Sequence, residues 1–104
     1  MSAFRIHRNN SASSEHYPFI IDVQSELLSS LDTRLAIPLV LSTKIAGAAI
    51  KNLNPTIYID QSVYVVLTQQ LAAIPKAVLG EELDGIDIDR NQLLSSIDFL
   101  ITGI

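Results

Sequence analysis

The hydrophobic residues of this chain follow a period of two over most of its length and change to a helical period only near the end. In residues 17–23, from Tyr17 to Val23, every second side chain is apolar, which is the pattern of a strand with one face buried. Residues 56–60 repeat this alternation. In residues 89–102, apolar side chains instead recur three and four positions apart, as in an amphipathic helix. The change of period predicts a mainly β fold with one C-terminal α-helix.

Several short runs of residues are expected to form strands, and two prolines lie inside them. Because proline cannot donate to a β-ladder, Pro38 and Pro75 are each expected at a sheet edge or a bulge. The gap from Asp60 to Ser62 fits a tight hairpin. Short helical turns are expected within residues 25–32 and 45–50. The expected strands are residues 4–8, 17–23, 34–41, 56–60, 63–67 and 71–79.

The expected C-terminal helix has recognisable ends and two distinct faces. Asp89 is a good N-cap, Gln92 completes a capping-box pattern, and Gly103 falls where a left-handed C-terminal residue belongs. The preceding acidic stretch, residues 81–89, suits the positive end of the helix dipole. The apolar stripe consists of Leu93, Leu94, Ile97, Leu100, Ile101 and Ile104, of which Leu93, Ile97 and Leu100 are expected in the core, and the polar face consists of Asn91, Ser95, Asp98 and Thr102.

Length, charge and composition bound the class of protein. A chain of 104 residues predicts a single domain over residues 1–104. A net charge of −4 argues against direct nucleic-acid binding, which requires a positive surface. The absence of cysteine excludes a thiolate nucleophile and a cysteine-ligated zinc. Charged residues make up only 17%, so apolar surface is left over that an oligomer could bury.

No segment has the pattern of a membrane span or a targeting signal. The longest charge-free window, residues 61–75, is shorter than the ~20 apolar residues that a spanning helix needs. Residues 1–8 lack the apolar centre of a signal peptide. We therefore expect a cytoplasmic protein that does not engage a membrane.

Two histidines flank the first polar loop and are the main candidates for catalysis. His7 and His16 could act as a general acid and base, but two surface histidines on adjacent strands are the simpler interpretation. A metal would need a third ligand, for which only Glu15 lies nearby in the sequence. Motifs for a nucleotide, a cofactor or a nucleophilic serine are missing from the sequence. The chain is therefore expected to bind rather than to catalyse, without cofactor or metal.

Two further clusters each have a structural and a functional interpretation. Asp84, Asp87 and Asp89 could hold a divalent cation, but the glycine and final glutamate of an EF-hand are missing, which favours an acidic helix start. Leu27 and Leu28 are either core residues or an exposed apolar contact, and leucine is more often buried.

Several stretches, taken together in this order and spacing, resemble the CcdB family. They are DVQSELL at residues 22–28, RLAIPL at residues 34–39, PTIYI at residues 55–59, VLGEE at residues 78–82 and IDFLITGI at residues 97–104. The DVQS, IPL and terminal Gly-Ile motifs are jointly specific, and the similarity in order extends over essentially the whole chain.

The resemblance implies a toxin of a type II toxin–antitoxin module that is not an enzyme. The implied fold is an SH3-like, partly open barrel, with a five-stranded antiparallel sheet, a small second sheet and the C-terminal helix, assembled as a homodimer. Such toxins bind the A subunit of DNA gyrase and trap the enzyme on cleaved DNA. A cognate antitoxin neutralises the toxin, and the joint complex represses its own operon, so operator DNA is reached only through the antitoxin.

The resemblance also implies a gyrase-binding surface and favours an exposed position for Leu27 and Leu28. Thr102 stands where the best-known members carry a tryptophan that stacks on a gyrase arginine. Threonine cannot supply that cation–π contact, which is worth ~0.5–2 kcal/mol. The implied gyrase-binding residues are Ser25, Leu27, Leu28, Ser95, Asp98, Thr102, Gly103 and Ile104.

Two other functions stay open at this point. Endoribonuclease toxins of the MazF type share the implied fold, and fold does not fix function. The net charge of −4 disfavours an RNA groove, and only His7 and His16 support this alternative. A non-toxic homologue that only titrates an antitoxin is compatible with Thr102. The polar loop of residues 9–14 is a candidate antitoxin contact.

Overall fold

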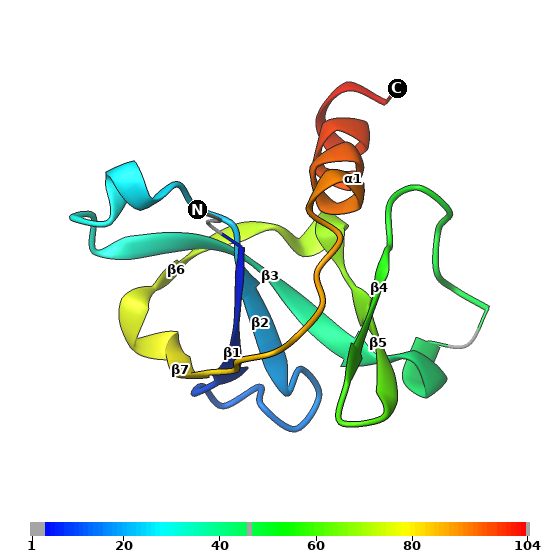
Figure 1. Ribbon diagram of the computed structural model, residues 1–104, viewed down its shortest axis with the longest axis horizontal. Helices are drawn as coiled ribbons and strands as arrows, with labels where there is room; N and C mark the ends of the chain where they lie inside the picture. The colour runs from blue at the N-terminus through cyan, green and yellow to red at the C-terminus, as the bar shows by residue number, and fades with distance from the viewer. Residues whose placement is uncertain (1–3, 46, 104) are drawn as a thin grey trace.

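The computed structural model describes residues 4–45 and 47–103 and consists of an antiparallel sheet with one long helix at its end (Figure 1). This confirms the mainly β class and the C-terminal helix. The strands are β1 (Arg5–Asn9), β2 (Phe19–Asp22), β3 (Thr33–Leu41), β4 (Thr56–Ile59), β5 (Ser62–Val66), β6 (Ala72–Pro75) and β7 (Leu79–Glu82). The helix is α1 (Arg90–Thr102), and the short 3₁₀ turns are η1 (Glu26–Leu28), η2 (Ser42–Ile45), η3 (Thr68–Gln70) and η4 (Lys76–Val78).

The strands form one seven-stranded sheet rather than a five-stranded sheet with a separate small one. Its order is β4-β5-β3-β2-β1-β7, and β6 pairs with β3 off this path. The sheet does not close into a barrel. The length of β3 explains the difference from the expected arrangement. Its first half pairs with β6 and its second half with β5, so both groups of strands join one hydrogen-bonded network.

The two prolines lie where the sheet can accommodate a missing N–H. On one side of Pro38, β2 provides the partner Ile20. On its other side, Pro38 falls between Ala36, which pairs with β6, and Leu39, which pairs with β5. Pro38 therefore lies at a break in the ladder rather than on an edge strand. Pro75 ends β6, whose pairing in the described sheet is to β3, as expected for an edge position.

A tight turn joins β4 to β5, as the sequence predicts. Asp60 and Gln61 both have positive φ angles, 51° and 68°, and the flanking pair is Ile59 with Ser62. Two residues with positive φ define the turn type whose twist matches that of the adjoining strands. The hairpin prediction is confirmed: Asp60 is among the residues that this turn prefers at its first position, whereas Gln61 stands where glycine is preferred.

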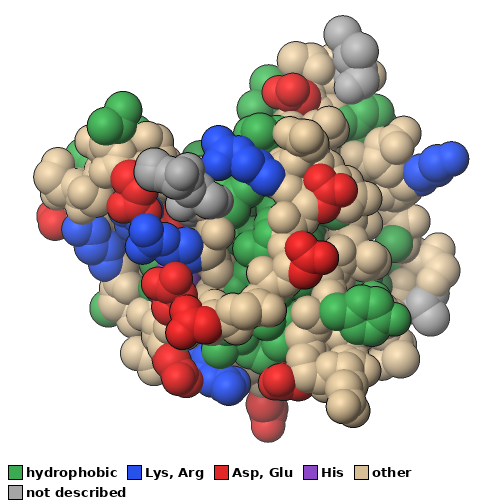
Figure 2. All heavy atoms as spheres, in the orientation of Figure 1, with side chains coloured by type: hydrophobic (Ala, Val, Ile, Leu, Met, Phe, Trp, Pro, Cys, Tyr) green, Lys and Arg blue, Asp and Glu red, His purple; other side chains and the backbone are tan. Residues whose placement is uncertain are grey.

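The region from residue 71 to residue 89 departs most from the prediction. The expected strand of residues 71–79 ends at Pro75, and the chain makes η4 before it enters β7. Glu81 and Glu82 were expected to belong to an acidic helix start, but they lie in β7 beside β1. There Arg8 Nε lies 3.1 Å from Glu81 Oε1, and charged side chains gather over these two strands (Figure 2). The residues belong to a strand because they pair with β1, in the register His7 with Glu82 and Asn9 with Leu79, and the exposed ion pair adds only a weak contact.

A smaller difference concerns the expected helical turn at residues 45–50. The structure places a turn earlier, at η2, and Gly47 then adopts a φ of 80°. That left-handed conformation interrupts a helix and is inexpensive for glycine. Ala46, which the expected turn includes, lies outside the described residues.

The main core lies on the face of the sheet that the helix and its preceding segment cover. Side chains from most strands meet there, and Phe19 packs edge-on against Tyr64 with ring centroids 5.1 Å apart. The segment between β7 and α1 crosses this face (Figure 1) and packs Leu83, Ile86 and Ile88 against the core. The described part of the chain contains no helix with the length and apolar character that a bilayer-spanning segment requires. The fully buried apolar residues include Ile6, Ile21, Ile37, Leu39, Ile59, Val66 and Leu93.

Candidate functional site

The start of α1 is anchored and capped as the sequence predicts. The Asp89 carboxylate accepts a hydrogen bond from the Gln92 backbone N–H at 3.1 Å. At the other end, Gly103 has a φ of 76° and donates its N–H to the Phe99 carbonyl at 2.8 Å. Leu93 is buried among the core residues, and Ser96 is buried beside Thr68. The first half of the helix is therefore fixed to the sheet.

The second half of α1 projects beyond the sheet (Figure 1). The prediction that Leu100 is a core residue is wrong. Leu100 is 37% exposed, Leu94 is 41% exposed and Ile101 is 71% exposed. The helix leaves the sheet after Ile97, which is half-buried, so the later turns have little to pack against. Ile104, the last residue of the expected stripe and of the implied gyrase-binding surface, lies outside the described residues.

The polar face of α1 points to solvent. Ser95, Asp98 and Thr102 are exposed, as is Gly103. The Thr102 hydroxyl donates to the Asp98 carbonyl at 2.8 Å, so this donor is used within the helix. Thr102 therefore presents to solvent a short side chain that is hydrogen-bonded to the backbone of its own helix.

The turn η1 presents two leucines to solvent. The Ser25 hydroxyl accepts the Leu27 N–H at 3.1 Å and caps the turn. Leu27 is 93% exposed and Leu28 is 49% exposed. The alternative in which these leucines belong to the core is therefore wrong, and the exposed alternative holds. Leu31, three positions further on, is 48% exposed, so three exposed leucines lie within five residues of the chain. Apolar surface gathered in this way, rather than a single exposed leucine, indicates an interaction site.

Two grooves on either flank of α1 divide the implied gyrase-binding residues. Ser25 and Leu27 line a groove of about 340 Å³ that also reaches α1. Ser95 lines a different groove, of about 460 Å³, with the chain around Asn54. Asp98, Thr102 and Gly103 lie along the projecting end of the helix. The full lining of the first groove is Phe4, Val23, Ser25, Glu26, Leu27, Arg90 and Leu94.

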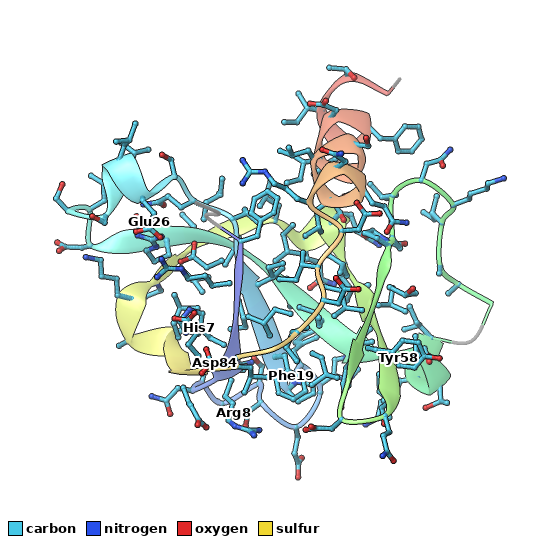
Figure 3. The ribbon with its side chains drawn as sticks, viewed as in Figure 1. His7, Arg8, Phe19, Glu26, Tyr58 and Asp84 are labelled. Carbon is cyan, nitrogen blue, oxygen red and sulfur yellow. The ribbon has the colours of Figure 1, made fainter. Side chains whose placement is uncertain are left out.

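The groove between η1 and α1 combines an apolar lining with charges near its rim. The Arg90 guanidinium lies over the Phe4 ring, 5.3 Å from its centroid. Glu26, which Figure 3 shows on the turn, pairs with Arg5 at 3.3 Å. An apolar lining with flanking charged groups is the usual composition of a protein-binding surface. The arrangement can bind another protein through leucine contacts and orient it by charge.

The catalytic candidates have separate surroundings. His7 belongs to β1 and is half-buried beside β7 (Figure 3). Its Nδ1 donates to the Gly80 carbonyl at 3.0 Å. His16 is exposed and stacks edge-on against Tyr17, with ring centroids 4.4 Å apart. Among residues 4–45 and 47–103, no group of three or more histidine, aspartate or glutamate side chains is placed to hold a metal ion. Glu15 and the aspartates before α1 are thus not assembled into such a group.

Leu94 and Ile101 belong to the apolar stripe predicted from the sequence, which names neither of them as a site candidate, and both are exposed in the structure. Leu94 and Ile101 are seven positions apart and share one flank of α1. Their spacing is the same whether that flank faces a core or solvent. The low charged fraction was the available signal, because it implied more apolar side chains than one small core could bury.

A comparison with protein-family models supports the resemblance carried by the motifs. The model described as CcdB protein matches residues 3–103 of the 104-residue chain. The match therefore includes β1 through β7, η1 and α1, and with them both grooves.

Proposed function

The chain belongs to the CcdB family, the toxins of toxin–antitoxin modules, and on this premise we propose that it binds the A subunit of DNA gyrase and traps gyrase on cleaved DNA. Its gyrase-binding surface would comprise the η1 turn and the projecting end of α1. In this mechanism the chain acts by binding alone, and the covalent link between gyrase and DNA is made by gyrase itself.

The observation that carries this proposal is the exposure of Leu27. Its side chain is 93% exposed although the turn that carries it is capped and hydrogen-bonded. Burying a whole leucine side chain on binding is worth about 1.5–3 kcal/mol. Leu28 beside it, and Ile101 on the projecting end of α1, provide further exposed apolar side chains for contact with gyrase.

Thr102 changes how that affinity would arise. Because the threonine hydroxyl donates to Asp98 and the side chain carries no ring, it supplies no cation–π contact to gyrase. We assign the corresponding energy to apolar burial of Leu27 and of Ile101, which is 71% exposed. This assignment predicts that the affinity for gyrase depends only weakly on salt concentration. Binding through an arginine–aromatic contact with flanking charges would depend on it more strongly.

The remaining parts of the proposal concern partners. Exposed apolar side chains outside the gyrase surface, such as Leu35 and Ile50, favour a homodimer that would bury them. A cognate antitoxin would neutralise the toxin, and its complex with the toxin would repress the operon. Because the net charge is −4, contact with operator DNA would come from the antitoxin. Gyrase and its DNA place this activity in the cytoplasm.

A cleavage assay tests the proposal against its alternatives. Purified protein is incubated with gyrase and supercoiled plasmid, the reaction is stopped with detergent, and a parallel sample contains mRNA. Linear plasmid in a dose-dependent amount is the expected result. Cut mRNA would instead indicate a MazF-type endoribonuclease, and neither product would indicate a homologue that only titrates an antitoxin. Co-expression with the adjacent small reading frame should restore growth to cells that produce the toxin.

A further inference from the structure

We propose that Gln24 is a positioning residue that holds the η1 turn, and with it Leu27, in the geometry that gyrase binds. The inference rests on the proposed function, because it assigns a role to residues behind the surface that contacts gyrase. It also explains why the sequence DVQS precedes the turn, since Asp22, Gln24 and Ser25 each make a different contact that fixes it.

Gln24 joins the end of the turn to the neighbouring strand. Its side chain is buried, with 7% exposure. The amide Nε2 donates to the Leu28 carbonyl at 2.9 Å, and Oε1 accepts the Leu35 N–H at 2.9 Å. One planar amide therefore ties the last residue of η1 to β3. Leu28 directly follows Leu27, so the bond fixes the backbone on which Leu27 is presented.

A buried ion pair in turn fixes Gln24. Arg34 Nη2 and Nε lie 2.8 Å and 3.0 Å from Asp22 Oδ2, and both side chains are almost wholly buried. The other carboxylate oxygen, Asp22 Oδ1, accepts the Gln24 N–H at 3.0 Å. The Asp22 carboxylate thus links the Arg34 guanidinium on β3 to the Gln24 backbone.

The turn needs these bonds because packing does not hold it. None of its three residues is buried, and a 3₁₀ turn of this length has poor hydrogen-bond geometry of its own. Two surface contacts also reach the region, from Arg5 to Glu26 and from Lys76 Nζ to the Ser29 carbonyl. Exposed charged contacts of this kind are weak in water. The buried amide of Gln24 is therefore the contact best placed to hold the turn in one conformation.

Holding the turn before binding raises affinity because less conformational freedom is lost on association. The alternative is that Gln24 only stabilises the fold. The two roles differ in what they predict for gyrase. A stabilising residue changes the population of folded protein, whereas a positioning residue changes the affinity of protein that is fully folded.

The test compares Gln24→Met, which removes both side-chain hydrogen bonds, with Asn9→Leu as a matched control. Asn9 is also a buried amide, and it holds a different loop through Ser13 and the Tyr17 carbonyl. Gln24→Glu is the second variant: it keeps an acceptor for the Leu35 N–H, but it loses the donor to Leu28 and places a buried carboxylate against the Leu28 carbonyl. All measurements are made well below the melting temperature of each variant, so that the protein is folded.

The first readout is hydrogen exchange at the Leu27 and Leu28 amides, which does not involve gyrase. Both amides are hydrogen-bonded within the turn, to the Ser25 hydroxyl and to the Ser25 carbonyl. Gln24→Met and Gln24→Glu should increase their exchange at least about tenfold, because the turn opens locally. Asn9→Leu should leave it unchanged. Wild-type exchange in both Gln24 variants would overturn the inference.

The second readout is affinity for the purified gyrase A subunit, measured for Gln24→Met, Leu27→Ala and the double variant. Gln24→Met should weaken binding about tenfold in the wild-type background but hardly at all beside Leu27→Ala, because residues that act through one another are not additive. An additive loss, or no loss from Gln24→Met while Leu27→Ala weakens binding, would overturn the positioning role. Unchanged binding by Leu27→Ala would overturn the proposed gyrase surface itself, and with it the positioning role of Gln24.

Discussion

Thr68 and Ser96 form a buried hydrogen bond that links η3 to the first half of α1. The Thr68 hydroxyl donates to the Ser96 hydroxyl oxygen at 3.3 Å, and Ser96 donates onward to the Leu93 carbonyl at 2.8 Å. The two side chains are 0% and 1% exposed. A polar contact therefore lies where the periodicity of the helix would place an apolar one.

Breaking this contact from one side should destabilise the protein more than removing it from both. Ser96→Ala leaves the Thr68 hydroxyl buried without its acceptor, which costs about 1–3 kcal/mol. Adding Thr68→Val removes the unpaired hydroxyl donor, so the double variant should regain much of the unfolding free energy that Ser96→Ala loses. Denaturant unfolding of the four proteins measures the cycle. If the losses of unfolding free energy in the two single variants instead add up in the double variant, the two hydroxyl groups are energetically independent.

Leu93 and Leu100 should differ sharply in their contribution to stability. Leu93 is 1% exposed, so Leu93→Ala should cost about 2–5 kcal/mol through the cavity it leaves. Leu100 is 37% exposed, so Leu100→Ala should cost about 1 kcal/mol or less. Thermal and denaturant unfolding provide the comparison. A large loss from Leu100→Ala would mean that the end of the helix is covered, by a second copy or otherwise.

The β4–β5 turn should accept a stabilising change. Asp60 and Gln61 both adopt positive φ, which costs non-glycine residues energy. Replacing them with Asn-Gly, the preferred pair for this turn, should raise the unfolding free energy by about 0.5–1 kcal/mol. Ser62→Gly in the adjoining strand serves as the control and should lower it. If Asn-Gly instead destabilises the hairpin, the assigned turn conformation is wrong.

Sedimentation tests the proposed homodimer. At micromolar concentration the protein should sediment with about twice its chain mass of 11.4 kDa. A dilution series should then show dissociation and give the affinity of the pair. A species of one chain mass at every concentration would contradict the homodimer. The exposed apolar surface would then be available only to other partners.

The parts of the fold that the sequence predicts well are those set by neighbouring residues. Asp89 and Gly103 define the ends of α1 through bonds within one helical turn. The turn between β4 and β5 is likewise determined by its own two residues, Asp60 and Gln61. Such features depend on local conformational preference, which is visible in a short window of sequence.

The parts that the sequence did not predict depend on contacts between distant segments. Whether Glu81 lies in a strand depends on pairing with β1, where its contact Arg8 is 73 positions away in the chain. Whether Leu100 is buried depends on how far the sheet extends beneath the helix, and the apolar spacing is the same in either case. For the same reason, composition could not decide whether Leu27 was core or surface, and only the resemblance favoured the exposed position.

The most direct test of the account is the affinity of this chain for the isolated DNA gyrase A subunit, measured by calorimetry. Wild-type protein should bind, and Leu27→Asp should weaken binding at least about a hundredfold, because it places a charge in an apolar contact. Deleting Gly103 and Ile104 should also weaken binding while α1 stays folded. Tyr58→Asp is the control, since Tyr58 is 71% exposed on β4, away from η1 (Figure 3). No binding by the wild type, or an equal loss from Tyr58→Asp, would contradict the proposed gyrase surface.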